Sequence, residues 1–400
     1  MRRRVAITGL GAICALGSDV PTVWAALKAG TSGIGPIRGI PTERLSASIA
    51  AEINGFDAAA HFDSRRLPLM DRAAQLAVVA AREAMLAASL LPDAAQAHRR
   101  GVILAAAIGQ SSLDAAYLAF YGEGAARVHP LTVPRVMPNA PASHLSMEFG
   151  LCGPSYAVAS ACASANHAIG LAADTIRAGR AEVMLTGGAD ASIVVGVFKC
   201  WEALRVLSAD ACRPFSRDRS GLVLGEGAAV LVLEDWDHAR RRDAPILAEL
   251  AGSGMSADGL DLTAPDAGGA ASAMRAALDD AVLDPAEIGY VNAHGTGTRL
   301  NDRTESAALR QVFGRPPLVS SSKSMIGHCL SAGGALEAVA TIMALRDGVL
   351  PPTAGFREAD PECDVDCVPN VSRASPIQAA LSNSFAFGGL NAVLAFRRAA

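Results

Sequence analysis

Hydrophobic positions along the chain form short continuous apolar runs that alternate with longer segments of helical periodicity. Continuous runs such as 227–235 ("GAAVLVLED") are typical of strands that are buried on both faces of a sheet. Segments such as 71–90 repeat their apolar residues at the spacing of an amphipathic helix. This alternation predicts an α/β protein around a buried sheet. Strands are expected within 3–11, 100–109, 181–190, 227–235, 244–256, 288–298 and 317–328, and helices over 71–90, 163–178, 268–282 and 303–313.

Two segments of the chain resemble each other. Residues 155–180 and 317–348 each read as a strand, a turn of small residues and a long helix that ends in a basic residue shortly before a glycine. Duplication into two similar half-chains that meet at a shared site would explain the likeness. Because helices commonly end in this way, chance is the alternative. No low-complexity linker separates the halves, which favours one compact body.

Composition narrows the class of protein. The chain has 400 residues, 51% of them hydrophobic, and a formal net charge of −4. A large buried core is therefore expected, and the charge gives no reason to expect a nucleic-acid partner. Gly, Asp, Arg or Pro interrupts every apolar run before the roughly 18 residues that a membrane helix requires. The opening "MRRRVAITGLGAICALG" reads as a strand and turn rather than a secretory signal, so a cytoplasmic enzyme is expected.

Two features that could indicate a metal or a nucleotide cofactor are weak. The eight cysteines lack the paired spacings of a zinc site, even at Cys363 and Cys367, so reduced thiols and no metal are expected. The segment "GLGAIC" (9–14) is similar to the start of a dinucleotide-binding turn, but Cys14 replaces the third glycine. We interpret it as a tight strand-to-helix turn. A nicotinamide-dependent dehydrogenase is the alternative.

Cys162 lies where the strand-like "AVAS" gives way to a helical pattern. A free cysteine in an Ala-rich segment is usually a small buried hydrophobic residue. At a helix start, however, unpaired N–H groups and the helix dipole favour a thiolate, and backbone amides can hold an oxyanion. Ala161, Ala163 and Ser164 leave space for an acyl chain. Cys162 is therefore a candidate nucleophile.

Histidine and lysine residues occupy two further turns of small residues. His294 lies in "VNAHGTGT", where Thr296 and Thr298 offer hydroxyls to the amides of an extended substrate. Lys323 lies five residues before His328 in "SSSKSMIGH" and is one of three lysines in the chain. A lone histidine is more often a structural hydrogen-bonding residue, and a turn lysine is more often a surface charge. Together with Cys162, however, they form the set of nucleophile and polar donors that thioester chemistry needs.

A fourth turn of small residues joins two strand-like runs near the end of the chain, in "LSNSFAFGGLNAVLAF" (381–396). It reads as an ordinary hairpin, but Phe387 beside two glycines could also move as a gate.

An ordered set of motifs spans the chain: "VAITGLGAICALG", "SACAS", "RPFSRDRSGLVLGEGA", "NAHGTGT", "KSMIGH" and "NSFAFGGLN". This set resembles the β-ketoacyl-acyl carrier protein synthases of the type II elongating group. The segments "KCWEALRVLSADACRPFS" and "PPTAGFREADPECDVDCVPN" are similar to nodulation, polyene and polyketide members more than to the housekeeping enzyme. The resemblance implies the thiolase fold, a five-layered αβαβα body of two βαβαβαββ halves. We expect these halves at 1–240, with the nucleophile, and at 241–400, with the histidines, the lysine and the gate.

The resemblance also implies a role for each candidate. Cys162 would accept the acyl chain, while His294 and His328 would support decarboxylation. Lys323 would organise the site, hydrogen-bonded near Glu305 and His328, so that Lys323→Ala should harm elongation much more than folding. The backbone amides of Cys162 and Phe387 would form the oxyanion hole, with Phe387 as the gate. Substrate contacts are expected from Ile108, Thr132, Phe198, Thr296, Thr298 and Glu305, and carrier-protein docking from Arg65, Arg66, Arg127, Lys199 and Arg205.

Two positions depart from the family pattern. Ala386 stands where glycine is usual, and Leu390 stands where threonine is usual. Since alanine does not adopt a positive φ cheaply, a stiffer gate is expected. The small Thr132 predicts tolerance of a longer or more rigid acyl chain.

The reaction expected from this resemblance is the decarboxylative condensation of an acyl chain on Cys162 with malonyl-acyl carrier protein. No cofactor is expected, because the substrates are carried on the phosphopantetheine arm of the carrier protein. The expected partners are the acyl carrier protein and a second ketosynthase subunit, identical or homologous. The alternatives are a chain-length-setting subunit, which typically lacks the nucleophile, and a thiolase acting on coenzyme A esters, which would use a second cysteine rather than two histidines.

Overall fold

A single large sheet organises the molecule. The computed structural model describes residues 2–107 and 109–399, and in this part of the chain ten strands form one sheet in the order β10-β9-β13-β14-β8-β1-β7-β6-β4-β5. The predicted α/β class is confirmed. The strands are β1 (Val5–Cys14), β4 (Arg100–Ala106), β5 (Ser155–Val158), β6 (Val183–Asp190), β7 (Gly227–Asp235), β8 (Ala248–Ala257), β9 (Ile288–Asn292), β10 (Leu318–Ser320), β13 (Ala379–Ala386) and β14 (Leu390–Arg398).

The order of strands reveals an internal repeat. Strands β4, β5 and β6 are mutually parallel neighbours, as are β9, β10 and β13, and each set continues into an antiparallel pair, β7 and β1 or β14 and β8. Within the sheet, the described strands of the two five-stranded halves are joined by the short antiparallel pairing of β1 with β8. The likeness between 155–180 and 317–348 therefore reflects corresponding places in the two halves. We propose on this basis that the halves divide near residue 240.

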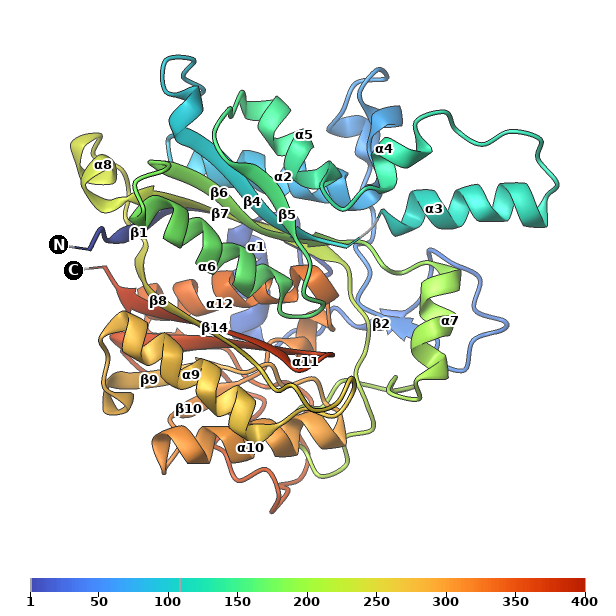
Figure 1. The fold of residues 1–400 in the computed structure, drawn as a ribbon. Helices are drawn as coiled ribbons and strands as arrows, with labels where there is room; N and C mark the ends of the chain where they lie inside the picture. Colours follow the sequence, from blue (N-terminus) through green and yellow to red (C-terminus); the bar gives the residue numbers. More distant parts are fainter. Residues whose placement is uncertain (1, 108, 400) are drawn as a thin grey trace.

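Helices lie in three layers around the two halves of the sheet (Figure 1). Two long helices, α6 and α12, form the central layer between the halves. The outer layers are α2 with α5 on one side and α9 with α10 on the other. This is the five-layered arrangement that the thiolase fold predicts. The helices are α1 (Val20–Ala29), α2 (Arg72–Ala87), α3 (Gln110–Tyr117), α4 (Thr132–Val136), α5 (Ala140–Phe149), α6 (Ser164–Arg177), α7 (Val195–Ala203), α8 (Trp236–Arg241), α9 (Ala267–Ala281), α10 (Arg299–Phe313), α11 (Lys323–Ile326) and α12 (Gly333–Asp347).

The central layer brings the candidate site together. Each of α6 and α12 follows the edge strand of its own half, β5 or β10, and the two helices pack against each other. Every residue of α12 from Gly333 to Leu345 is buried. Turns before these helices therefore meet at the interface between the halves, although Cys162 and His328 are far apart in the chain.

One local expectation is wrong. The segment "GLGAIC" is not a turn, because β1 continues through it to Cys14. The glycines serve helix packing instead: a Cβ at Gly11 would lie 1.8 Å from the carbonyl oxygen of Ala80, and one at Gly9 would lie 2.1 Å from that of Ala84. Both carbonyls belong to α2. The feature that suggested a nucleotide site is thus a close contact between strand and helix.

The described helices also bear on membrane insertion. Over residues 2–107 and 109–399, no helix has the length and apolar character needed to cross a bilayer.

Candidate active site

Cys162 lies in a tight turn directly before α6. Ala161 adopts a positive φ of 48°, which is unusual for a residue with a side chain. The Ser164 hydroxyl stabilises the turn, since it accepts from the backbone N–H of Ser160 at 2.7 Å and donates to the carbonyl of Ala161 at 2.6 Å. Cys162 is 7% exposed and lines a cavity. The strained, fixed turn holds the thiol at the helix N-terminus, as predicted from the sequence.

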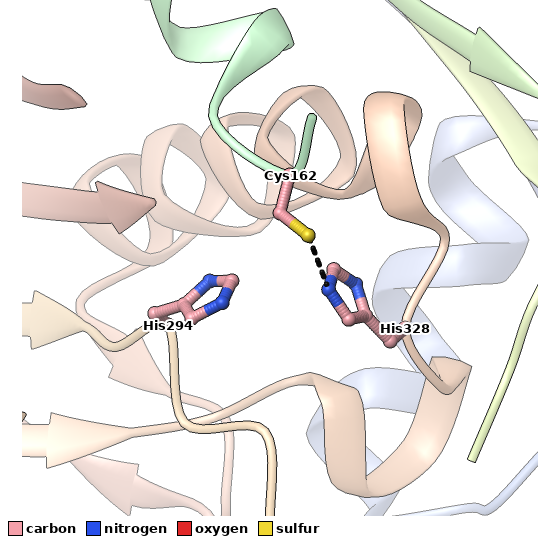
Figure 2. A group of neighbouring side chains, drawn as sticks. All are labelled: Cys162, His294 and His328. Atoms are coloured by element: carbon pink, nitrogen blue, oxygen red, sulfur yellow. Dashed lines mark hydrogen bonds between the residues drawn. The ribbon is translucent and has the colours of Figure 1, made fainter. Parts of the chain in front are cut away.

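Two histidines from the other half of the sheet face this sulfur (Figure 2). Nε2 of His328 lies 3.1 Å from Sγ of Cys162. The rings of His294 and His328 are nearly perpendicular, with centroids 5.4 Å apart. His294 follows β9, and His328 follows α11. The structure therefore brings together three residues that the sequence places in separate turns.

Lys323 contacts His294 and Glu337, and this differs from the expected partners. Its Nζ lies 3.3 Å from Nδ1 of His294 and forms a fully buried ion pair with the Glu337 carboxylate on α12. The expectation of Glu305 and His328 as partners is wrong. Lys323 is the first residue of α11, and its side chain reaches Glu337 on the central helix α12.

Glu305 instead supports the loop that carries His294. Its carboxylate accepts the backbone N–H groups of His294 at 2.9 Å and Gly295 at 2.7 Å. The side chain of Asn383 on β13 donates to it at 3.1 Å. Glu305 is thus a residue behind the site and does not line the cavity next to Cys162.

Hydrogen bonding assigns the proton in each imidazole ring. The Lys323 ammonium can only donate, so Nδ1 of His294 accepts and the ring proton lies on Nε2. The backbone N–H of Leu330 donates to Nδ1 of His328 at 3.3 Å, which leaves the proton of that ring on Nε2 as well. For both rings, burial holds the pKa well below its usual value, and the positive charge of Lys323 lowers it further. Two neutral rings therefore present N–H donors to the site.

Charge and burial oppose each other at the thiol. Burial raises the pKa of Cys162 to about 12, although the positive charge of Lys323 acts to lower it. The expectation of a sulfur that rests as an anion is therefore wrong for the resting enzyme. Desolvation of a thiolate outweighs the attraction of the helix terminus and of Lys323. The nucleophile must form as the proton leaves during attack.

A cavity of about 680 Å³, including its open mouth, leads from solvent to the three residues. The hydroxyls of Thr296 and Thr298 lie along it, 2.9 Å from each other, as expected of groups that contact an extended arm. Phe387 also lines it, and its ring stacks on Trp201 of α7 with centroids 5.8 Å apart.

The two departures from the family pattern have little effect on backbone conformation. Ala386 ends strand β13 and pairs with Leu390 at the start of β14, and its φ is not positive. The left-handed positions of the turn are Gly388, with φ of 83°, and Gly389, with φ of 66°. Ala386 therefore needs no positive φ in this structure, because the residues that do are still glycines, and the stiffer gate stays a prediction.

The remaining substrate residues are not brought to this cavity. Phe198 is buried on the inner side of α7 against a separate apolar cluster. Thr132 on α4 lines a different surface hollow, which it shares with Arg127. Ile108 lies outside the described residues. A tunnel built from these residues remains a prediction.

The docking residues differ in their surroundings. Arg65, Arg127, Lys199 and Arg205 are exposed, whereas Arg66 forms an ion pair with Glu148 at 2.5 Å. Lys199 is paired with Glu202. Of the neighbouring Arg65 and Arg66, Arg65 is therefore more available to a partner protein.

The donor set of the site could also accept a metal. One atom each of Cys162, His294 and His328 lies within 4.8 Å of the others. Thiolate and imidazole are ligands that zinc accepts. In this structure Cys162 and both imidazoles are instead engaged in hydrogen bonds, which is the arrangement that acyl transfer and enolate stabilisation require.

Sequence reasoning missed two residues of the site. Glu337 is a single acidic residue in the apolar stretch "ALEAVATIMAL" of α12, and a lone charge in such a helix requires a buried partner. Trp201 is one of three tryptophans and lies two residues after Lys199. Neither its exposure nor its contact with Phe387 could be inferred from local pattern.

Family models match most of the chain. Residues 2–239 match the beta-ketoacyl synthase N-terminal domain, and residues 247–357 match the beta-ketoacyl synthase C-terminal domain. The chain belongs to the beta-ketoacyl synthase family. This confirms the resemblance drawn from the ordered motifs.

Individual relatives of this ketosynthase agree with the family models. Nodulation protein E of Rhizobium sp. (strain N33) is 50% identical over the full length of both chains. The 3-oxoacyl-[acyl-carrier-protein] synthase 2 of Staphylococcus aureus (strain COL) is 40% identical, with 99% of this chain and 98% of the relative covered. The ishigamide ketosynthase/chain length factor has a TM-score of 0.96 at 38% identity, and the AntDE:AntF complex, a type II polyketide ketosynthase with its acyl-carrier protein, has 0.91 at 30%, each over all of both chains. These likenesses confirm the thiolase fold.

Proposed function

We propose that this ketosynthase condenses an acyl chain held on Cys162 with malonyl-acyl carrier protein and releases CO₂, which extends the chain by two carbons. The observation that carries the proposal is the convergence of Cys162 with two neutral imidazoles that each carry their proton on Nε2, with Nε2 of His328 3.1 Å from Sγ. A nucleophile beside two such donors suits both thioester attack and enolate formation.

In the first half-reaction, Sγ of Cys162 attacks the carbonyl of an acyl thioester. The N–H of His328 at 3.1 Å stabilises the sulfur as its negative charge develops. The proton of the thiol is transferred to the departing pantetheine sulfur, so the high pKa of Cys162 limits only its resting charge. We assign the oxyanion hole to the backbone amides of Cys162 and Phe387, both of which line the cavity.

In the second half-reaction, the malonyl thioester occupies the same cavity. Loss of CO₂ leaves an enolate, whose oxygen can accept the Nε2 protons of His294 and His328. Both rings are neutral and carry their proton on Nε2, so each can donate this hydrogen bond in its resting state. The enolate carbon then attacks the acyl group on Cys162 and expels the Cys162 thiolate, which takes up a proton from solvent to regain the resting thiol.

Carrier-borne substrates fit the open end of the cavity. Thr296 and Thr298 line the same cavity as the histidines, and their hydroxyls can hydrogen-bond a pantetheine arm. Arg65, Arg66, Arg127, Lys199 and Arg205 are the proposed contacts for an acidic carrier protein. The proposed steps use no further cofactor, because the imidazoles supply the hydrogen-bond donors and solvent supplies the one proton that Cys162 takes up.

A second subunit is part of the proposal. Aromatic side chains on and beside α3 are exposed: Tyr117 by 56%, Phe120 by 52% and Tyr121 by 79%. Such a patch is typical of an interface. We propose a homodimer or a heterodimer with a homologous ketosynthase, and a cytoplasmic location, which suits a chain whose eight cysteines are free.

The test is a reconstituted reaction. The protein is incubated with a panel of acyl-carrier proteins, and the mass of the peptide that contains Cys162 is measured before and after malonyl-carrier protein is added. We expect acylation at Cys162 alone, its loss on addition of the malonyl substrate, and a product two carbons longer. Acylation elsewhere, or product formation by Cys162→Ala, would contradict the proposal.

A chain-length-setting subunit without its own activity is the second candidate. The presence of Cys162 next to both histidines disfavours it. It predicts that the protein alone acylates no cysteine in the same assay.

A further inference from the structure

Asp190 is a buried carboxylate that the proposed reaction does not use. It is 1% exposed at the end of β6, and none of the ion pairs formed within the described residues includes it. Its oxygens accept from Ser192 and from two donors of Ser331: the backbone N–H at 3.2 Å and the hydroxyl at 2.8 Å. A buried charge without a cation costs free energy, so its hydrogen bonds to this segment need an explanation.

Ser331 belongs to the segment that carries His328. The short helix Leu330–Ala332 begins two residues after His328, and the N–H of Leu330 donates to that ring. Leu330 has a positive φ of 44°, a strained conformation for a branched side chain. Such strain persists only where neighbouring contacts fix it, and Asp190 supplies two of these contacts one residue away.

Packing leaves this segment little freedom. A Cβ at Gly188 of β6 would lie 2.7 Å from the carbonyl oxygen of Ser331, so the glycine allows the two segments to touch. The Ser331 hydroxyl also donates to the carbonyl of Ala189 at 3.1 Å. Thus β6, from the first half of the chain, packs against and hydrogen-bonds Ser331, which lies three residues after His328 in the second half.

We propose that Asp190 is a positioning residue that fixes the 328–331 segment and so directs the N–H of His328 towards Cys162. This rests on the proposed condensation and adds a residue to it. Asp190 does not touch the reacting atoms. Its hydrogen bonds to Ser331 hold Leu330, and Leu330 in turn fixes the proton and orientation of the His328 ring.

The ionisation state of Asp190 should therefore affect how firmly the 328–331 segment is held. Burial raises its pKa to about 6, while the hydrogen bonds from Ser192 and Ser331 act to lower it. The titratable groups around it are Asp71 next to α2, Cys162 before α6, and Cys329 beside Ser331, and the charge of Asp71 also raises the pKa. Below pH 6 the protonated carboxyl is a weaker acceptor for the two Ser331 donors, both of which reach Oδ2, and the segment is held less firmly.

The test compares Asp190→Asn with the parent in the full-length protein. We expect kcat of Asp190→Asn to fall about 10- to 100-fold, as small misplacement of a reacting group does, with KM for the carrier substrates unchanged. The kcat–pH profile of the parent should lose activity through pH 6, and Asp190→Asn should lack this step. Parent-like kcat with the same acid limb would overturn the proposal.

Thermal stability separates positioning from a merely structural role. The pKa of Asp190 is raised on folding from about 3.8, so the stability contributed by its neutral form is lost as pH rises through 6. At pH 7.5 the charged carboxylate therefore destabilises the folded state. Asp190→Asn should then keep the parent Tm or exceed it while losing activity. A Tm that falls together with kcat in Asp190→Asn would overturn the proposal.

Two further variants guard against a failure to fold. Ser331→Ala removes only the hydroxyl donor and should lower kcat less than Asp190→Asn, with the acid limb retained; no effect would count against the proposal. Glu83→Gln is the matched control, since Glu83 also accepts two backbone N–H groups but lies remote from His328. Its kcat should equal that of the parent. If the parent itself forms no condensation product, the proposed function fails, which is distinct from failure of this inference.

Discussion

Nζ of Lys323 lies 3.3 Å from Nδ1 of His294 and at the same time forms an ion pair with Glu337 in the protein interior. The pair joins α11 to the central helix α12. Lys323 therefore both fixes the tautomer of a catalytic ring and neutralises a buried carboxylate. These two tasks explain why a lysine, rare in this chain, occurs at this turn.

Removal of Lys323 should harm the fold as well as the reaction. Lys323→Ala leaves Glu337 buried without a partner, which typically costs about 3–5 kcal/mol, and condensation should fall about 100-fold as the proton of His294 is no longer fixed. This revises the expectation that folding would be largely spared. Burial already raises the pKa of Glu337 to about 7, so the loss of stability should be larger at pH 8 than at pH 6.

Denaturant unfolding at the two pH values measures this loss. The double variant Lys323→Ala/Glu337→Gln is the control, because it removes the unpaired charge. It should regain stability without regaining activity. Full activity in either variant would show that Lys323 does not act on His294.

The two histidines should not titrate in the working range of the enzyme. Burial and the charge of Lys323 hold the pKa of both rings well below 6.5, so neither ring is expected to become protonated above pH 6. Stability that depends on the neutral rings is present above pH 6.5 and is lost as pH falls through the lower pKa of the folded state. Titration of ¹⁵N-labelled histidines by NMR would show this, and a ring shift centred near 6.5 for either residue would contradict it.

Alkylation of Cys162 should remain slow at neutral pH and rise steeply with pH. With a pKa of about 12, the thiolate fraction grows about tenfold for each pH unit between 6 and 10. Inactivation rates with iodoacetamide, together with mass spectrometry of the peptide, measure the effect at this thiol alone. The exposed Cys200 serves as an internal control within the same digest. A plateau of the Cys162 rate below pH 8 would show a resting thiolate.

Charge reversal at Arg65 should weaken carrier docking without affecting chemistry. Arg65→Glu is expected to raise KM for carrier-bound substrates about threefold or more at low salt and to leave small thioester mimics unaffected. Arg66→Glu should in addition lower Tm by a few degrees, because it places an acid next to Glu148. Steady-state kinetics at two salt concentrations tests both variants. An equal effect on the mimics would rule out a docking role.

Trp201 should restrain the gate. Its ring stacks on Phe387, and such a stack contributes about 0.5–1.5 kcal/mol. Trp201→Ala is therefore expected to speed acylation of Cys162 by bulky chains by up to about tenfold, with Trp201→Phe as the conservative control. Stopped-flow acylation measures the rate. A slower reaction with short and long chains alike would show that Trp201 acts only as a wall of the cavity.

Local sequence pattern was sufficient where the local chain decides the structure. The turn before α6 could be predicted because small residues lead from a strand into a helix, and helix ends carry unpaired N–H groups. The repeat of strand, turn and helix in 155–180 and 317–348 was visible for the same reason. By contrast, "GLGAIC" was misread, since the reason for its glycines lies in α2, some seventy residues away.

The partners of charged residues depended on contacts between distant parts of the chain. Glu305 and Glu337 are both acidic residues on helices of the second half, and nothing in their local sequence shows which one faces Lys323. Only the direction in which α11 enters the central layer selects Glu337. The resting charge of Cys162 was misjudged in the same way, because its burial depends on both halves together.

The sequence by itself determined the family and the alternation of strands and helices, and it predicted the nucleophile and its donors, because these depend on residue type and short-range spacing. Tertiary structure alone decided which carboxylate pairs with Lys323, which ring nitrogen carries each proton, and how Asp190 reaches the segment beyond His328. Those properties arise from desolvation and from contacts across the two halves of the sheet, and neither is encoded in any single stretch of the chain.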